Sequence, residues 1–324
     1  MMKRLLSLLL ALLLIPAALA EEGTMTDEQI TRLLWEMYQT ENGDAGYLVL
    51  PEEYEVPPEG KTGIYNLLLL GIDNPTDSLK GRSDTMLLAS LNAYTGRLKL
   101  VSFLRDTYVS IPRHGHNKLN AAYSYGGADL LLETLGKSFG VHVDGYVAVN
   151  YALMAALVDA IGGVELEVSE GELKKLNGIL EYYNYLRGAP EEEGLLAQPG
   201  RQVLTGLQTM SFARIRKLDS DFMRVQRQQK VVLAIYRKLR TLDALTLTGI
   251  ITEYIGKVGT NVTLAQAAAL VAGVLAQDEL TTETLRIPKE GAYTRKTIND
   301  TYFVVPNLDK CRKAISAFLY GQEE

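Results

Sequence analysis

The chain has few of the residues on which several common chemistries depend. Its 324 residues include one cysteine, one tryptophan and three histidines. A single cysteine, Cys311, rules out an intramolecular disulfide framework. His114 and His116 flank a glycine, and we expect them to be solvated loop residues rather than ligands or catalytic bases. Chemistry that depends on a cysteine thiol or a histidine imidazole is therefore not expected in this chain.

The chain also lacks an overall positive charge. Its formal net charge is −6 and its sequence pI is about 5.4. An acidic protein repels the phosphate backbone, so nucleic acid is not expected as the main partner. With 47% hydrophobic and 22% charged residues, the composition is that of a globular protein able to bury a full core.

One long apolar run is present, at the N-terminus. Lys3 and Arg4 precede the apolar residues from 5 to 14, and Ala18-Leu19-Ala20 supplies the small residues of a signal-peptidase site. The run from 5 to 20 falls short of the roughly 20 residues of a membrane span, so we expect a signal peptide cleaved before Glu21, with a retained anchor as the alternative. The rest of the chain is expected to be extracytoplasmic, either secreted or attached to the outer face of the cytoplasmic membrane.

The remaining sequence predicts one α/β domain. After the leader at 1–20, residues 21–60 read as a helical stalk followed by a Pro-rich linker, and residues 61–324 as the catalytic domain. Apolar runs predict strands at 65–72, 85–91, 98–104, 145–149 and 164–168, with a hairpin turn at 94–96. Helices are expected near 128–139, 151–161, 205–213, 221–240, 262–276 and 307–320. This order predicts a three-layer α/β/α sandwich with a central mixed β-sheet.

Arginines are crowded into one short stretch. Arg214 and Arg216 lie two residues apart, and a predicted helix beginning at Asp221 places Arg224, Arg227 and Gln228 on one arc. Guanidinium groups bind phosphate in a bidentate manner and stay charged at any working pH. Such crowding indicates a polyanionic ligand such as a diphosphate; the alternative is a solvated basic helix paired with surface acids.

Carboxylates stand at the edges of three predicted strands. Asp73 follows the first strand, Asp84 precedes the second and Asp106 follows the third. Carboxylates that converge at one sheet edge form a frame for Mg²⁺, which prefers a few carboxylates together with substrate phosphate oxygens. As ordinary turn-forming residues, Asp73 and Asp84 would need no ligand.

At these residues the sequence resembles the LytR-CpsA-Psr family of bacterial cell-envelope glycopolymer ligases. Six motifs occur in the family's order between residue 65 and about residue 240. The segments are Leu70-Gly71-Ile72-Asp73, Gly81-Arg82-Ser83-Asp84-Thr85-Met86, Ser102-Phe103-Leu104-Arg105-Asp106-Thr107, Lys118-Leu119-Asn120-Ala121-Ala122-Tyr123-Ser124-Tyr125-Gly126-Gly127, Ile161-Gly162-Gly163-Val164 and the arginine-rich stretch from 212 to 228. The pair Phe103-Leu104 stands where the family more often shows Ile-Pro, a change that removes no phosphate ligand.

The resemblance implies a Mg²⁺-dependent (or Mn²⁺-dependent) extracytoplasmic phosphotransferase of cell-wall assembly. It would move a glycopolymer, a teichoic acid or capsule, from a polyprenyl-pyrophosphate carrier at the membrane surface to a peptidoglycan hydroxyl. Asp84 and Asp106 would hold the metal, and Asp73 or Asp221 would accept the acceptor's proton or orient arginines. The residues implied to bind the pyrophosphate are Arg82, Arg105, Lys118, Arg214, Arg216, Arg224, Arg227 and Gln228; Arg105 would also act in catalysis.

The lipid tail of such a carrier would need an apolar slot. Leu153, Leu157 and Ile161, or Val231, Val232 and Ile235, would line one between helices and sheet, unless they are core packing residues. Residues 177–194 look like an insertion whose tyrosines are expected to pack, with an aromatic hairpin or short helix at the rim of an acceptor groove as the alternative. Two other functions stay open: a lipid-diphosphate-binding regulatory module without turnover, and a hydrolase that cleaves the same pyrophosphate with water.

Overall fold

The computed structural model describes residues 64–74, 78–92, 97–216, 218, 221–263, 266–267 and 281–321. The predicted signal peptide, the predicted helical stalk and the Pro-rich linker lie outside these residues, so they remain predictions. No helix among the described residues is long and apolar enough to cross a membrane.

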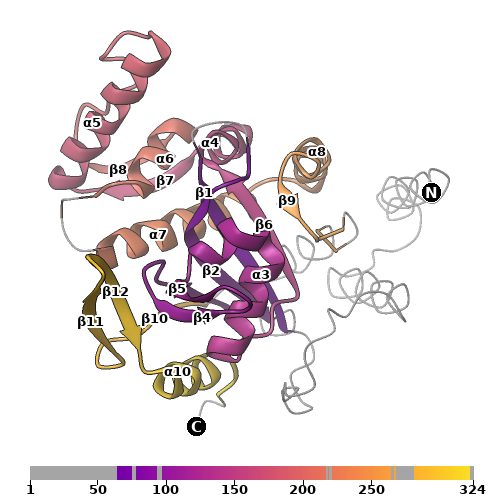
Figure 1. Ribbon diagram of the computed structural model, residues 1–324. Helices are drawn as coiled ribbons and strands as arrows, with labels where there is room; N and C mark the ends of the chain where they lie inside the picture. The colour runs from indigo at the N-terminus through magenta and orange to yellow at the C-terminus, as the bar shows by residue number, and fades with distance from the viewer. Residues whose placement is uncertain are drawn as a thin grey trace, which may run out of the picture.

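A six-stranded sheet forms the centre of the molecule (Figure 1). Its strand order is β10–β3–β2–β1–β6–β9, and β1 pairs antiparallel with β2 but parallel with β6. The predicted mixed α/β sheet is therefore confirmed. The strands are β1 (Ile64–Asp73), β2 (Arg82–Asn92), β3 (Arg97–Phe103), β6 (Gly145–Asn150), β9 (Gly259–Thr260) and β10 (Thr282–Ile287).

Strand side chains alternate between two helical layers. Leu68, Leu70 and Leu88 point into a large core cluster shared with α3 (Ala121–Phe139) and α10 (Leu308–Tyr320). Leu69 and Leu87 point the other way, toward α7 (Asp221–Leu239). Because neighbouring strand residues face opposite sides, each strand contributes to both layers, as the predicted sandwich requires.

Smaller elements surround this sandwich. Among the described residues, β4 (Tyr108–Ile111) with β5 (Gly115–Lys118) and β11 (Tyr293–Ile298) with β12 (Thr301–Pro306) form hairpins. Strands β7 (Val164–Val168) and β8 (Gly200–Leu204) form a further antiparallel pair, although residues 169–199 separate them in the chain. The remaining helices are α4 (Tyr151–Ala160), α5 (Glu170–Arg187), α6 (Gly206–Ala213) and α8 (Ala244–Tyr254). Helix α5 projects from the rest of the molecule (Figure 1).

The predicted elements agree with the structure to within a few residues in most places. The strand predicted at 164–168 is β7. Strands β2 and β3 are antiparallel and their last paired residues are Asn92 and Arg97, as the predicted hairpin requires. Its turn, and most of the helix predicted at 262–276, lie outside the described residues. The β4–β5 hairpin, α8, strands β8 and β9 and the strands after residue 280 were not predicted, and a helix near α5 was considered only as an alternative.

Helix α5 corrects the prediction for residues 177–194. Ser169 and Glu172 form a capping box that starts a helix of 18 residues, and Gly188 ends it in the left-handed conformation. The predicted packing of its tyrosines is wrong for two of them, because Tyr182 is 60% exposed and Tyr185 is 73% exposed.

Candidate functional site

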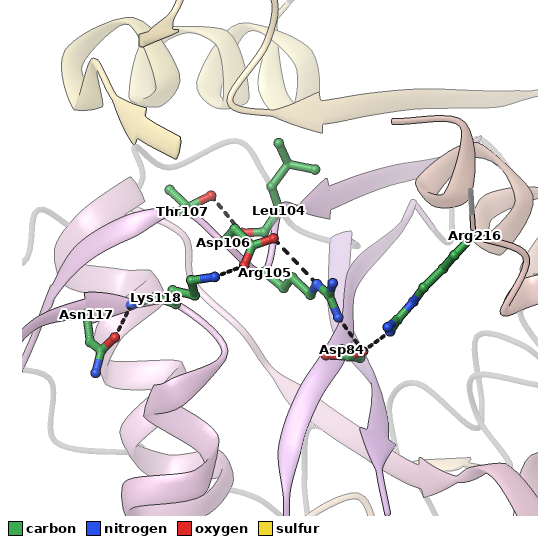
Figure 2. Close-up of polar contacts among 8 residues, drawn as sticks. All are labelled: Asp84, Leu104, Arg105, Asp106, Thr107, Asn117, Lys118 and Arg216. Atoms are coloured by element: carbon green, nitrogen blue, oxygen red, sulfur yellow. Dashed lines mark hydrogen bonds and ion pairs between the residues drawn. The ribbon is translucent and has the colours of Figure 1, made fainter. Parts of the chain in front are cut away.

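A chain of ion pairs crosses one edge of the central sheet (Figure 2). Asp84 lies at the start of β2, Arg105 and Asp106 follow the end of β3, and Lys118 ends β5. Arg105 Nη1 donates to Asp84 Oδ2 at 2.6 Å, and its Nε lies 3.6 Å from Asp106 Oδ2. Lys118 Nζ donates to Asp106 Oδ1 at 2.6 Å. Four residues from three strand ends thus form one charged network.

Arg216 joins this network from the opposite side. It follows α6, and its Nη2 donates to Asp84 Oδ2 at 2.7 Å (Figure 2). Asp84, whose side chain is only 9% exposed, therefore accepts hydrogen bonds from two guanidinium groups on one oxygen. Because Arg216 is 48% exposed, much of its guanidinium faces solvent, where an anion can approach.

Arg214 is held between two tyrosine side chains. Its guanidinium carbon lies 4.0 Å from the ring centre of Tyr151 and 5.6 Å from that of Tyr183. The guanidinium also donates a hydrogen bond to the Tyr183 hydroxyl. Cation–π contact with two rings fixes the orientation of a side chain that otherwise has many rotamers.

Burial raises the pKa of Tyr151. The nearby Arg214 opposes that change, whereas the carboxylates of Asp73 and Asp84 raise the pKa further. Asp73 also hydrogen-bonds to the Tyr151 side chain. The phenol thus keeps its proton at neutral pH and acts as a hydrogen-bond donor.

An apolar cavity of about 420 Å³ opens beside these charged groups. Leu69 and Leu87 from the sheet, Leu157 from α4, and Val232 and Ile235 from α7 line its interior. Its mouth carries polar side chains. The polar residues that line the cavity include Asp84, Arg214, Arg216, Arg224 and Gln228. A charged rim around an apolar interior fits a ligand with a polyanionic head and a hydrocarbon tail.

The predicted slot residues largely face this cavity. Leu157 and Ile161 line it, as do Val231, Val232 and Ile235, whereas Leu153 is not among its lining residues. Helix α8, which was not predicted, contributes Ile250, Ile251 and Tyr254 to the far wall.

The arc predicted on α7 is divided in the structure. Arg224 and Gln228 line the cavity mouth. Arg227 is 1% exposed and points instead into the protein, where its Nε donates to Glu172 Oε1 at 3.0 Å and its Nη1 to the Ile215 carbonyl at 3.1 Å. Arg227 thus ties α7 to the start of α5. The side chain of Asp221 lies outside the described residues.

Asp73 and Arg82 occupy facing positions on β1 and β2. Both are exposed, and the register between the strands shifts between Gly71 and Ile72. Beyond that shift, Asp73 hydrogen-bonds to Tyr151, which lines the cavity, although Asp73 itself is not among the lining residues. Arg82 is not among the residues that line the cavity.

The carboxylates partly meet the requirements of a metal ion. Among the described residues, no group of three or more His, Cys, Asp or Glu side chains is arranged to hold one. Asp84 and Asp106 are joined through Arg105, and two carboxylates suit Mg²⁺ only when substrate phosphate oxygens and water complete its shell. The donor set therefore fits a magnesium ion that arrives with a phosphorylated ligand.

Sequence reasoning missed two residues of this site. Tyr151 follows Asn150, which caps α4 at the end of β6, a place where strand-end side chains converge. That position was a usable signal. Tyr183 had none, because its contact with Arg214 depends on the path of α5.

The chain matches the LytR_cpsA_psr family model over residues 37–315. The polyisoprenyl-teichoic acid–peptidoglycan teichoic acid transferase TagU of Oceanobacillus iheyensis is 32% identical over 269 residues, or 80% of this chain and 76% of the relative. TagU of Enterococcus faecalis is 35% identical over 187 residues, 56% of each protein. The chain thus spans little more than half the length of that relative.

Solved structures show the same fold. B. subtilis TagT is 26% identical, with a TM-score of 0.63 over 82% of this chain and 94% of that one. TagT bound to LIIa-WTA is 25% identical, with a TM-score of 0.66 over 82% of this chain and 95% of that one. From the family match, the relatives and the shared fold, we conclude that the chain belongs to the LytR_cpsA_psr family.

Proposed function

We propose that the protein transfers a glycopolymer from a polyprenyl-pyrophosphate carrier to a hydroxyl group of peptidoglycan, at the outer face of the cytoplasmic membrane. The observation that carries the proposal is the apolar cavity with Asp84, Arg214, Arg216 and Arg224 at its mouth. The related TagU and TagT proteins are teichoic acid transferases that act between a polyisoprenyl-linked polymer and peptidoglycan, which supports the same reaction type.

In this proposal the cavity receives the polyprenyl chain, and the pyrophosphate lies at its mouth. The acceptor oxygen attacks the sugar-proximal phosphorus, the bond from that phosphorus to the bridging oxygen breaks, and polyprenyl phosphate leaves with the electron pair. Arg105, Arg214 and Arg216 would neutralise the charge that develops on the phosphate oxygens. Lys118 would support them through its ion pair with Asp106.

The acceptor hydroxyl must also lose a proton. Asp73 and Asp221 are the two candidates for the base, and Asp73 is the one whose carboxylate has a defined position, against Tyr151. When Mg²⁺ is bound, Asp84 and Asp106 would hold it, and the ion would add positive charge beside the phosphate oxygens. Asp84 would then share its carboxylate between the ion and the two arginines.

Reconstitution with purified protein would test the proposed function. The assay contains a polyprenyl-pyrophosphate-linked saccharide, Mg²⁺ and soluble peptidoglycan fragments, and it measures both released polyprenyl phosphate and saccharide bound to peptidoglycan. The proposal expects both products in equal amounts. Release without attachment would indicate a hydrolase, and binding without release would indicate a regulatory module.

A further inference from the structure

A second groove lies at the other end of the ion-pair chain from the apolar cavity. It has a volume of about 360 Å³ and is bounded by the β4–β5 hairpin, the end of α3 and the junction of β12 with α10. Tyr108, Ser110 and His116 line it from the hairpin, Lys137 from α3 and Leu308 from α10. None of these residues belongs to the charged network described above.

The hairpin connects this groove directly to Lys118. Tyr108 pairs with Lys118 and Ser110 with His116, so all four side chains share one face of the hairpin. Val109 and Ile111 alternate with them and are buried in the core. The distance along β5 from Lys118 to His116 is two residues, or about 7 Å. A group bound beside His116 is therefore about one sugar residue from the charged network.

Aromatic contacts support this face of the hairpin. The Tyr108 ring stacks on His116 with 5.3 Å between ring centres and meets the edge of Phe303 at 4.9 Å. Lys118 Nζ lies 5.7 Å from the centre of the same Phe303 ring. The exposed imidazole of His116 thus offers a flat surface that is braced from behind by two further rings.

The chemistry of the groove suits a sugar. Its flat ring surface can pack against the C–H face of a sugar, while the hydroxyls of Tyr108 and Ser110 can meet its oxygen atoms. The ammonium of Lys137 donates to Glu133 Oε1 at 2.9 Å and, with three N–H donors, can also meet a sugar oxygen. No Asp or Glu is among the residues that line it, so it would accept a neutral or anionic glycan. A lipid tail would instead favour the apolar cavity.

We propose that this groove, defined by Tyr108, Ser110, His116 and Lys137, binds the glycan strand of the acceptor. The inference rests on the proposed function, because a transferase needs a second substrate beside its phosphate site. The lipid would enter at the Arg214–Arg216 end of the ion-pair chain and the acceptor at the Lys118 end. The sugar of the donor has similar chemistry, so the test must separate the two sources.

The test measures direct binding of a soluble, uncrosslinked peptidoglycan glycan oligosaccharide to the purified protein by calorimetry. His116→Ala should raise its dissociation constant roughly tenfold, the loss of one stacking contact. Ser110→Trp, which fills the groove without removing a buried side chain, should abolish binding. His114→Ala is the matched control, because His114 lies on the same hairpin but stacks on Tyr125 and does not line the groove; its affinity should not change.

A second measurement uses the donor. The affinity for the polyprenyl-pyrophosphate saccharide should be unchanged in His116→Ala and Ser110→Trp, and in the transfer assay only the KM for the acceptor should rise. Oligosaccharide binding that is absent from the unmodified protein, or unchanged in both variants, would overturn the groove assignment whatever the transfer assay gives. Weakened binding of the donor alone would overturn it too. Absent transfer with intact, groove-dependent binding would reject the enzyme proposal and keep the groove.

Discussion

Asp84 shows how one side chain can organise a charged site. Its carboxylate accepts from Arg105 at 2.6 Å and from Arg216 at 2.7 Å, and these two arginines come from segments more than 100 residues apart in the chain. Without a carboxylate between them, two guanidinium groups at this separation would repel each other. Asp84 therefore pre-positions both arginines before any phosphate binds.

We expect Asp84→Ala to abolish transfer without unfolding the protein. The substitution removes the shared acceptor and one proposed Mg²⁺ ligand, but it removes no apolar core volume. The measurements are transfer at several Mg²⁺ concentrations and thermal unfolding, with Asp309→Asn on the exposed face of α10 as the control. Turnover equal to that of the unmodified protein would exclude Asp84 as a ligand.

The arginines of the ion-pair network and of the cavity mouth give a second prediction at this scale. Loss of one charged contact to the transition state costs about 2 to 4 kcal/mol, or roughly 30- to 1000-fold in rate. We expect that loss for Arg105→Ala, Arg214→Ala and Arg216→Ala. Arg237→Ala and Arg240→Ala should retain activity, since these residues are on or just after α7 but neither line the cavity nor belong to the charged network. Equal losses in all five variants would point to general charge rather than a clamp.

At the scale of elements, α5 is attached to the site at two points. Near its start, the buried Arg227–Glu172 ion pair links it to α7. Farther along, Tyr183 contacts Arg214 at the cavity mouth. Between Glu172 and Tyr183 the helix rises about 16 Å, so the two contacts lie about three helical turns apart.

The buried ion pair should matter for stability rather than for binding. Arg227→Met leaves the Glu172 carboxylate buried without its partner, and such a loss typically costs about 3 to 5 kcal/mol. We expect urea unfolding to show this decrease, while Arg237→Met on the exposed face changes little. A variant that kept its stability but lost affinity for the pyrophosphate would instead assign Arg227 to the ligand.

The Arg227–Glu172 ion pair also predicts how the free energy of unfolding changes at acidic pH. Burial acts to raise the pKa of Glu172, but hydrogen bonds from Ser169 and Arg227 outweigh it and hold the pKa below the ordinary value of 4.5. A lowered folded-state pKa contributes stability that is fully present above about pH 4.5 and is lost as the pH falls through the folded-state value. Glu172→Gln should therefore flatten the acid side of the curve of unfolding free energy against pH, compared with Glu170→Gln in the same first turn of α5.

Tyr183 should act on the donor through Arg214. Tyr183→Phe keeps the ring but removes the hydroxyl that accepts from the guanidinium, a loss of about 1 kcal/mol or roughly fivefold in affinity. We expect a higher dissociation constant for the polyprenyl pyrophosphate in Tyr183→Phe but not in Tyr182→Phe, whose side chain is mostly exposed. If the effect persisted in an Arg214→Ala background, Tyr183 would not act through Arg214.

On the scale of the whole molecule, the two faces of the sheet are packed differently. The face toward α3 and α10 belongs to one large cluster of buried residues, whereas the face toward α4, α7 and α8 encloses the cavity. Stability can thus reside in one layer and ligand binding in the other. The charged network lies at the sheet edge, where both the cavity and the second groove approach it.

A substitution that fills the cavity should distinguish carriers by length. Ile235→Trp adds volume at the cavity wall. We expect it to lower the affinity for a long-chain polyprenyl pyrophosphate about tenfold more than the affinity for a short-chain one. Val203→Trp, on exposed strand β8, provides the control. Equal affinity for both chain lengths in Ile235→Trp would mean that the tail binds elsewhere.

Much of this arrangement could be predicted because it depends on local pattern. Apolar runs marked the main strands, and Asp84 and Arg105 lie at strand ends, where polar residues come together. Lys118 was expected from the family motif alone, because the β4–β5 hairpin that positions it was not predicted. The burial of the Arg227 side chain could not be predicted in the same way. Its position on the α7 arc matched that of Arg224, and only a contact with Glu172, 55 residues away in the sequence, turned it into the core.

The same limit applies to the cavity and to Tyr183. Val232 and Ile235 have the spacing of any buried helix face, and a slot differs from a core only in what the opposite elements leave empty. That depends on α8, whose position is a tertiary property. Tyr183 reaches Arg214 because α5 is 18 residues long and fixed near its start, and neither fact is visible in the tyrosine residues themselves.

The apolar interior of the cavity implies a particular competitor for the proposed carrier, namely the bilayer itself. A prenyl tail that leaves a membrane for this cavity exchanges one hydrocarbon environment for another, so the transfer of apolar surface contributes little net free energy. Selectivity among membrane lipids would then depend on the charged residues at the cavity mouth. A tail in detergent-free water would gain far more from the same walls, and affinities measured with water-soluble analogues would overstate what the protein achieves at a membrane.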